Sequence, residues 1–197
     1  MTTEFESINV LKLLDGFIDG QCIFDMDKAV LIETDQGAKL SRVTLCNIPK
    51  GSLVVPIDDI RTRATRGRRD CRVVSLLRED ARSKAHCLVD YLILAPKSCG
   101  TFDCYLVDLK SVRPKGFAIQ FLGAQCLVKY LESFMELQHA KPMCIARTIY
   151  VILQFGADAV KLPFGEFGTV ASSPTVPIRV FRQNEGKVYF RELSGRQ

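Results

Sequence analysis

The chain has 197 residues, the length of one average domain, and we expect a single domain over residues 1–197 with its core at about residues 70–155. Apolar residues make up 47% and charged residues 25%, which is typical of a globular protein and excludes intrinsic disorder, collagen-like repeats and a long coiled coil. The net charge of +5 is too small to indicate a nucleic-acid partner by itself.

Hydrophobic patterns along the chain predict a mixed α/β domain. Apolar residues spaced by three and four indicate helices, and short apolar runs between turn-forming residues indicate strands. The predicted elements in chain order are a helix at 4–19, a strand-rich segment at 21–60, a hairpin of strands at 87–94 and 102–109, a long helix at 117–138, a strand at 145–155, and a closing hairpin at 176–181 and 187–191. We therefore expect a central mixed β-sheet flanked by helices, with extra N-terminal strands and a C-terminal hairpin.

The eight cysteines are interpreted as reduced thiols of a cytoplasmic protein. The chain contains no C-x-x-C pair, and its first residues lack the charged-then-apolar pattern of a secretion signal. Because no C-x-x-C pair occurs, a structural zinc site is also disfavoured. No stretch approaches the roughly 18 uncharged apolar residues that a membrane-spanning helix requires, so we expect no membrane partner.

Positive charge is concentrated in one stretch, residues 61–84, which contains nine basic and three acidic residues and has a local net charge of +6. Such a field attracts polyanions, and phosphate contacts supply most of the non-specific affinity for nucleic acids. The candidate phosphate-binding residues are Arg61, Arg63, Arg66, Arg68 and Arg69. The alternatives are a solvated loop and a surface for a protein partner.

Two acidic residues lie at the ends of neighbouring apolar runs. Asp90 begins one run, and the sequence Asp108-Leu109-Lys110 ends the next. Strand alternation places Asp108 and Lys110 on one face, and pairing of the two strands would bring Asp90 close to them. Paired carboxylates suit a hard divalent cation, and a lysine beside them can position a water and neutralise charge on a phosphoryl group. The alternative is that each acid only ends a strand or pairs with a surface Lys or Arg.

These motifs resemble those of the PD-(D/E)xK nuclease superfamily, which has the restriction-endonuclease-like fold. The resemblance covers residues 87–130: the acid Asp90 within an apolar run, the D-x-K element Asp108-Leu109-Lys110, and a following helix that contains Gln120. It implies that Asp90 and Asp108 bind Mg²⁺ or Mn²⁺, that Lys110 assists the attacking water, and that Gln120 completes the catalytic site. It also implies a restriction-endonuclease-like core.

Several features depart from the pattern of this superfamily. The second acid is Asp where Glu is commoner, and no proline precedes Asp90. Gln125 and Tyr130 are five residues apart, where some recombination nucleases have a spacing of four. An additional acid from the first helix could come only from Glu4 or Glu6.

Two functions are compatible with these residues. The first is a metal-dependent nuclease that hydrolyses phosphodiester bonds of DNA, in preference to RNA, with Mg²⁺ or Mn²⁺ as cofactor. The second is a non-catalytic module on the same fold that binds a nucleic acid or a protein. Pairing with a second copy of the chain or with another protein is left open.

The arginine stretch leads to a first test, the joint replacement of Arg66, Arg68 and Arg69 by Ala. Each phosphate contact on duplex DNA contributes about −0.9 to the slope of log affinity against log salt, so we expect a slope that is shallower by up to about 3. Binding should weaken alike for all sequences, because backbone contacts carry no base information. The measurement is a salt titration of DNA binding, and a slope equal to that of the wild type would contradict the assignment.

Overall fold

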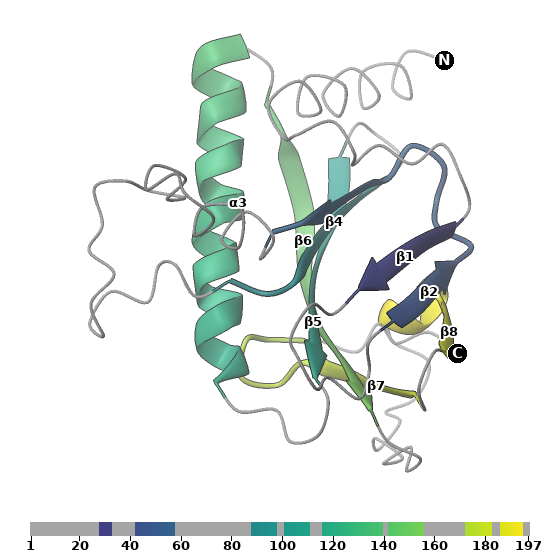
Figure 1. Ribbon diagram of the computed structural model, residues 1–197. Helices are drawn as coiled ribbons and strands as arrows, with labels where there is room; N and C mark the ends of the chain where they lie inside the picture. The colour runs from purple at the N-terminus through teal and green to yellow at the C-terminus, as the bar shows by residue number, and fades with distance from the viewer. Residues whose placement is uncertain are drawn as a thin grey trace, which may run out of the picture.

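The computed structural model describes residues 28–32, 42–57, 88–97, 101–110, 116–139, 142–155, 172–182 and 186–194, shown in Figure 1. The helices and strands in these ranges are β1 (Lys28–Ile32), β2 (Arg42–Cys46), β3 (Leu53–Pro56), β4 (Tyr91–Pro96), β5 (Thr101–Lys110), α3 (Phe117–His139), β6 (Cys144–Phe155), β7 (Ile178–Arg182), β8 (Gly186–Tyr189) and α4 (Phe190–Leu193). The fold is mixed α/β and consists mostly of strands.

The larger of two sheets has five strands in the order β3-β4-β5-β6-β7. Strands β3, β4 and β5 are antiparallel neighbours, and β6 and β7 continue the sheet in parallel pairing. The predicted pairing of the strands near 87–94 and 102–109 is confirmed: Tyr91 lies opposite Val107, and the register continues to Pro96 opposite Phe102. Parallel pairing of β5 with β6 requires a crossover connection, and α3 lies between these two strands in the sequence.

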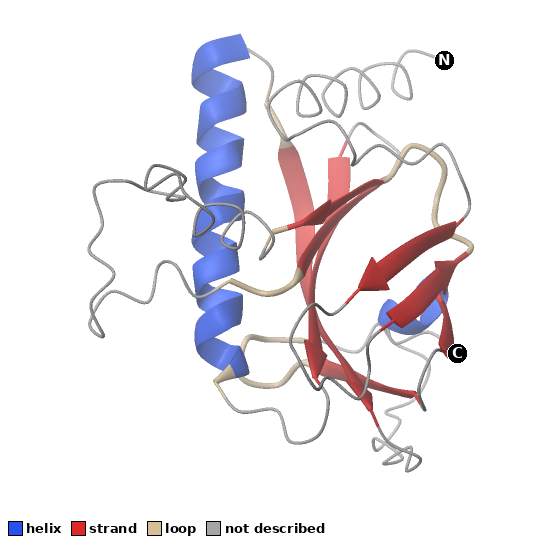
Figure 2. Cartoon of the chain, viewed as in Figure 1, coloured by secondary structure: helices blue, strands red, loops and turns tan. Residues whose placement is uncertain are grey.

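The predicted long helix is confirmed as α3, which covers one face of the five-stranded sheet (Figure 2). Gly116 precedes the helix with a φ of +74°, a conformation that favours glycine, and its carbonyl accepts hydrogen bonds from Ile119 N and Gln120 N. Phe121 of the helix is fully buried and meets Tyr150 of β6 edge to face. Phe121 belongs to a buried hydrophobic cluster between α3 and the sheet. The β5 residues in this cluster occupy even positions; they are Phe102, Cys104 and Leu106.

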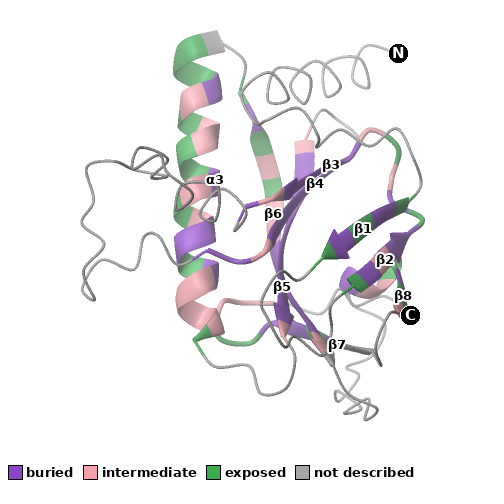
Figure 3. Cartoon of the chain, viewed as in Figure 1, coloured by how far each residue is buried: buried purple, intermediate pink, exposed green. Residues whose placement is uncertain are grey.

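The opposite face of the five-stranded sheet packs on a second sheet, with strand order β1-β2-β8. The two sheets share a core in which Leu31 and Leu45 of the smaller sheet pack with Ile93 and Val107 of the larger one. Figure 3 shows that burial is concentrated where the layers meet. The extra N-terminal strands were therefore predicted correctly, whereas a single central sheet flanked by helices is not confirmed.

The predicted closing hairpin is wrong, although both of its strands exist. β7 pairs with β6 in the larger sheet, where Val151 lies opposite Ile178, and β8 pairs with β2 in the smaller sheet, where Val43 lies opposite Gly186. Both pairings are parallel and bury apolar side chains that a two-stranded hairpin would leave in water. The predicted helix at 4–19 and the arginine stretch lie outside the described residues.

Tyr91 links the two sheets directly. Its side chain is buried, and its hydroxyl accepts a hydrogen bond from Ile32 N at 2.7 Å and donates one to Ile32 O at 3.0 Å. Ile32 is the last residue of β1, an edge strand of the smaller sheet. A side chain of β4 thus satisfies both backbone groups at the end of β1.

No helix in the described ranges is long and apolar enough to cross a membrane. The thiols of Cys46, Cys104, Cys126 and Cys144, the cysteines in these ranges, are free.

The Tyr91 contact gives a stability prediction. Tyr91→Phe should lower the free energy of unfolding by about 1–2 kcal/mol, because two backbone hydrogen bonds are lost at an end of β1 that water can still reach. The measurement is urea denaturation. The matched control is Tyr130→Phe, which removes a hydroxyl from a side chain that is 55% exposed and should change stability by less than about 0.5 kcal/mol. Equal stability of the two variants would contradict a linking role for Tyr91.

Candidate functional site

The structure brings Asp90, Asp108 and Lys110 together at one end of the five-stranded sheet. The Ile57 N–H donates a hydrogen bond to Asp90 O at 2.9 Å, which extends the β3–β4 ladder to Asp90. Tyr91 and Val107 form the last pair of the β4–β5 register, and Asp90 and Asp108 are the residues next to this pair in the chain. Both acids therefore lie at the same end of the sheet.

The carboxylate of Asp90 is held by the backbone of β5. Its Oδ2 accepts a hydrogen bond from Leu109 N at 2.5 Å. Beyond the last β4–β5 pair, the Leu109 N–H therefore bonds to a side chain instead of to the backbone of the neighbouring strand. This contact fixes the position of the Asp90 carboxylate relative to the end of β5.

Asp108 is fully buried and ion-paired with Lys110. The distance from Lys110 Nζ to Asp108 Oδ1 is 3.0 Å, and the lysine side chain keeps 22% of its surface exposed. The two residues are separated by Leu109 and therefore project from the same face of β5, as alternation predicts. That face is the one shared with Leu106 and α3.

Gln120 lies beside the segment that carries Asp90. Its Nε2 donates a hydrogen bond to Leu88 O at 3.3 Å, two residues before Asp90. The residue is in the first turn of α3, just after β5 in the chain. The structure therefore places Gln120 close to the candidate site through a backbone contact.

Sequence reasoning missed Gln154, the polar residue near the end of β6. The parallel register places Gln154 opposite Lys110 and Ile152 opposite Asp108, and Ile152 belongs to the core cluster on the α3 side. By alternation Gln154 shares the face of Asp108 and Lys110. The available signal was a polar residue near the end of an apolar run that follows a strand and a helix.

Among the other candidates, Tyr130 is 55% exposed and stacks on Phe134 of the same helix, which argues against a place for Tyr130 beside Asp108. The remaining candidates lie outside the described residues: Glu4, Glu6, Arg61, Arg63, Arg66, Arg68 and Arg69.

A second buried acid, Asp103, provides a contrast on the same strand. Arg147 Nη2 donates to Asp103 Oδ2 at 2.7 Å, and Lys97 Nζ lies 3.6 Å from Asp103 Oδ1. The hydrogen bond to Asp103 raises the pKa of Arg147 above its usual value, against the lowering effect of burial. Two cations thus surround one carboxylate at this end of β5. This arrangement needs no ligand to balance its charge.

At the candidate site, Asp108 is ion-paired with Lys110, and the Asp90 carboxylate is held by Leu109 N. The site therefore combines two carboxylates with one ammonium. No group of three His, Cys, Asp or Glu side chains in the part of the chain described here could hold a metal. Mg²⁺, however, often takes only one or two carboxylates and completes its shell with water and phosphate oxygens, so this donor set fits it.

Scans against protein-family models, curated proteins and solved structures found no match to this chain.

The buried ion pair leads to a stability prediction. Lys110→Met should lower the free energy of unfolding by up to about 3 kcal/mol. This value is the lower end of the range for broken buried ion pairs, and it is chosen because the Lys110 side chain is partly exposed. The double variant Asp108→Asn/Lys110→Met should recover at least about 1 kcal/mol, since the uncompensated charge is gone. Urea denaturation of the four proteins in the cycle measures both effects. Strictly additive effects would contradict coupling between the two side chains.

Proposed function

We propose that this protein is a metal-dependent nuclease that hydrolyses phosphodiester bonds of DNA, with RNA as the second choice of substrate. The observation that carries the proposal is the hydrogen bond from Leu109 N to Asp90, which places the Asp90 carboxylate beside the Asp108–Lys110 ion pair at one end of a buried sheet. The D-x-K resemblance in the sequence, together with Gln120 near the same place, adds support.

Asp90 and Asp108 would hold Mg²⁺ or Mn²⁺. A carboxylate offers about four lone-pair sites, so Asp90 can accept the Leu109 N–H and still ligate a cation. When bound, the cation supplies Lewis acidity toward a phosphoryl oxygen and lowers the pKa of coordinated water. Asp108 would exchange part of its interaction with Lys110 for the cation, which frees the lysine to face the substrate.

Lys110 is assigned the role of positioning the attacking water and of neutralising charge on the phosphoryl group. The water oxygen forms the new bond to phosphorus and releases a proton to solvent, the bond from phosphorus to the leaving ester oxygen breaks, and the leaving alkoxide takes a proton from solvent. Partial exposure of the Lys110 side chain fits this role, since its ammonium lies at the border between the core and solvent. The arginine stretch is proposed to bind backbone phosphates of the nucleic acid.

The alternative function is a non-catalytic module that binds a nucleic acid or a protein. One observation favours it: Asp108 is fully buried, and its ion pair with Lys110 neutralises it without any ligand. A purely structural pair would have the same geometry. The two functions differ in whether Asp90 is needed for cation binding.

The decisive variant is Asp90→Asn, because the amide oxygen can still accept the Leu109 N–H while the charge is lost. We expect cleavage of a labelled oligonucleotide in Mg²⁺ or Mn²⁺ to fall by at least about 100-fold, the upper end of the losses seen when groups that support a metal are removed. The matched control is Asp103→Asn, which neutralises a buried acid toward the opposite end of β5 and should keep cleavage.

Calorimetry with Mg²⁺ or Mn²⁺ on the same proteins separates the two functions. Binding that is present in the wild type and lost in Asp90→Asn supports the nuclease. No binding up to millimolar metal, or equal cleavage by the wild type and Asp90→Asn after removal of contaminating nucleases, would leave the binding module as the better assignment.

A further inference from the structure

The outer face of the three-stranded sheet carries a group of basic, aliphatic and aromatic side chains. The register aligns Lys28 with Cys46 and Tyr189, Val30 with Thr44 and Lys187, and Ile32 with Arg42. The alternate residues Ala29, Leu31, Val43, Leu45 and Val188 are buried against the larger sheet. We call the outward set the basic sheet face; its members are Lys28, Val30, Ile32, Arg42, Thr44, Lys187 and Tyr189.

Charge on this face has one sign. Its three charged members, Lys28, Arg42 and Lys187, are exposed cations, one on each strand, and none of its members is acidic. Among the described residues, no ion pair involves Lys28 or Arg42. Arg191 adds a fourth cation at the border of the face, with its guanidinium 5.7 Å from the centre of the Tyr189 ring.

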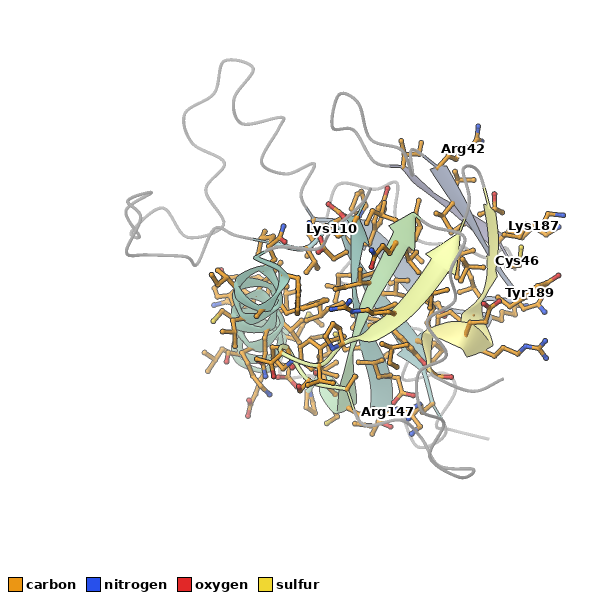
Figure 4. All side chains as sticks on the ribbon, turned by 90° about the horizontal axis from the view of Figure 1, so that it is seen from below. Arg42, Cys46, Lys110, Arg147, Lys187 and Tyr189 are labelled. Atoms are coloured by element: carbon orange, nitrogen blue, oxygen red, sulfur yellow. The ribbon has the colours of Figure 1, made fainter. Side chains whose placement is uncertain are left out.

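Apolar surface lies among these charges. Ile32 is 53% exposed, Tyr189 42% and Val30 38%. Figure 4 shows Arg42, Lys187 and Tyr189 projecting away from the core on one side of the molecule. Cations that only solvate a surface would not account for exposed aliphatic and aromatic side chains in the same rows.

This combination matches single-stranded nucleic acids. Proteins that bind single strands use cations to follow the phosphates and exposed aromatic rings to stack on bases. Three strands spaced about 4.8 Å apart and four or five residues long give a platform of about 10 by 15 Å, enough for a few nucleotides. Lys28 and Tyr189 align with each other across the sheet at one end of the platform, and Arg42 lies at the other end, opposite Ile32. Cations therefore border both ends of the platform.

The basic sheet face is distinct from the candidate site. Lys110 and Asp108 lie on the α3 side of the five-stranded sheet, whereas the small sheet packs on the opposite side. Figure 4 likewise shows Lys110 on the side of α3, away from Arg42 and Lys187. We propose that the basic sheet face is a second binding surface, specific for single-stranded nucleic acid; it does not rest on the proposed hydrolysis.

The experiment is a salt titration of binding to a labelled single strand of about 20 nucleotides, longer than one such module covers, by the full chain in EDTA so that cleavage plays no part. Single-strand contacts contribute about −0.7 each to the log-log slope, so Lys28→Gln/Arg42→Gln should make the slope shallower by about 1.4. That change corresponds to a loss of affinity of up to about 25-fold at 0.1 M salt. Tyr189→Ala should weaken binding about tenfold and Tyr189→Phe should not, because the ring is the stacking group.

The control is Lys97→Gln/Lys129→Gln, which removes the same charge from two exposed lysines elsewhere on the molecule. We expect its slope to equal that of the wild type. An unchanged slope in Lys28→Gln/Arg42→Gln would overturn the proposal, and so would losses confined to binding of phosphatidylserine vesicles. Equal losses on a duplex of the same length, with no effect of Tyr189→Ala, would overturn the single-strand assignment. These results do not depend on whether the wild type cleaves DNA.

Discussion

The hydrogen bond from Leu109 N to the carboxylate of Asp90 determines the geometry on which the candidate site depends. It lies just beyond the Tyr91–Val107 pair, so that the Asp90 carboxylate is held beside Asp108 at the end of the β4–β5 pairing. Alternation along β5 then puts Lys110 on the same face as Asp108. The crossover through α3 returns the chain as β6 in parallel with β5, which brings Gln154 opposite Lys110. The neighbours of the site thus depend on two registers, that of β4 with β5 and that of β5 with β6.

Much of the fold could be predicted from local patterns, and the pairing of distant strands could not. The β4–β5 pairing, α3 and β6 follow from apolar runs, turn residues and helical spacing close in sequence. Sheet membership of β7 and β8 depends on partners far away, such as Val151 for Ile178 and Val43 for Gly186. Two short strands separated by a Gly-containing turn favour a hairpin when only neighbouring residues are considered. Burial between two sheets outweighs that local preference, since each strand covers part of a shared core.

The candidate site, too, could be predicted where it depends on residues close in the chain, and could not be predicted where it depends on distant elements. Asp108 and Lys110 could be identified from a spacing of two, and Asp90 from its position at the start of the partner strand. The interaction of Gln120 with the Leu88 carbonyl depends on where α3 lies over the sheet, which helical periodicity does not specify. Gln154 depends on the register of a parallel pair, and that register is fixed only after the crossover helix has packed. The basic sheet face was missed for a related reason, because its cations come from three strands that are distant in sequence.

The two ends of β5 explain why one buried acid is interpreted as structural and the other as functional. Asp103 and Asp108 lie five residues apart on one strand, and both are removed from solvent. Asp103 has two cations around it, Arg147 and Lys97, so its burial is compensated within the protein. Asp108 is ion-paired with Lys110 at the other end of the strand, and there the Leu109 N–H holds the Asp90 carboxylate beside this pair. Asp103 thus has cations as its neighbours, whereas Asp108 has a second carboxylate close by. Two carboxylates can ligate a hard divalent cation, and an ammonium beside them can neutralise charge on a phosphoryl group. It is this neighbourhood, beyond the motif itself, that directs the proposed chemistry to the end of β5 beside Lys110.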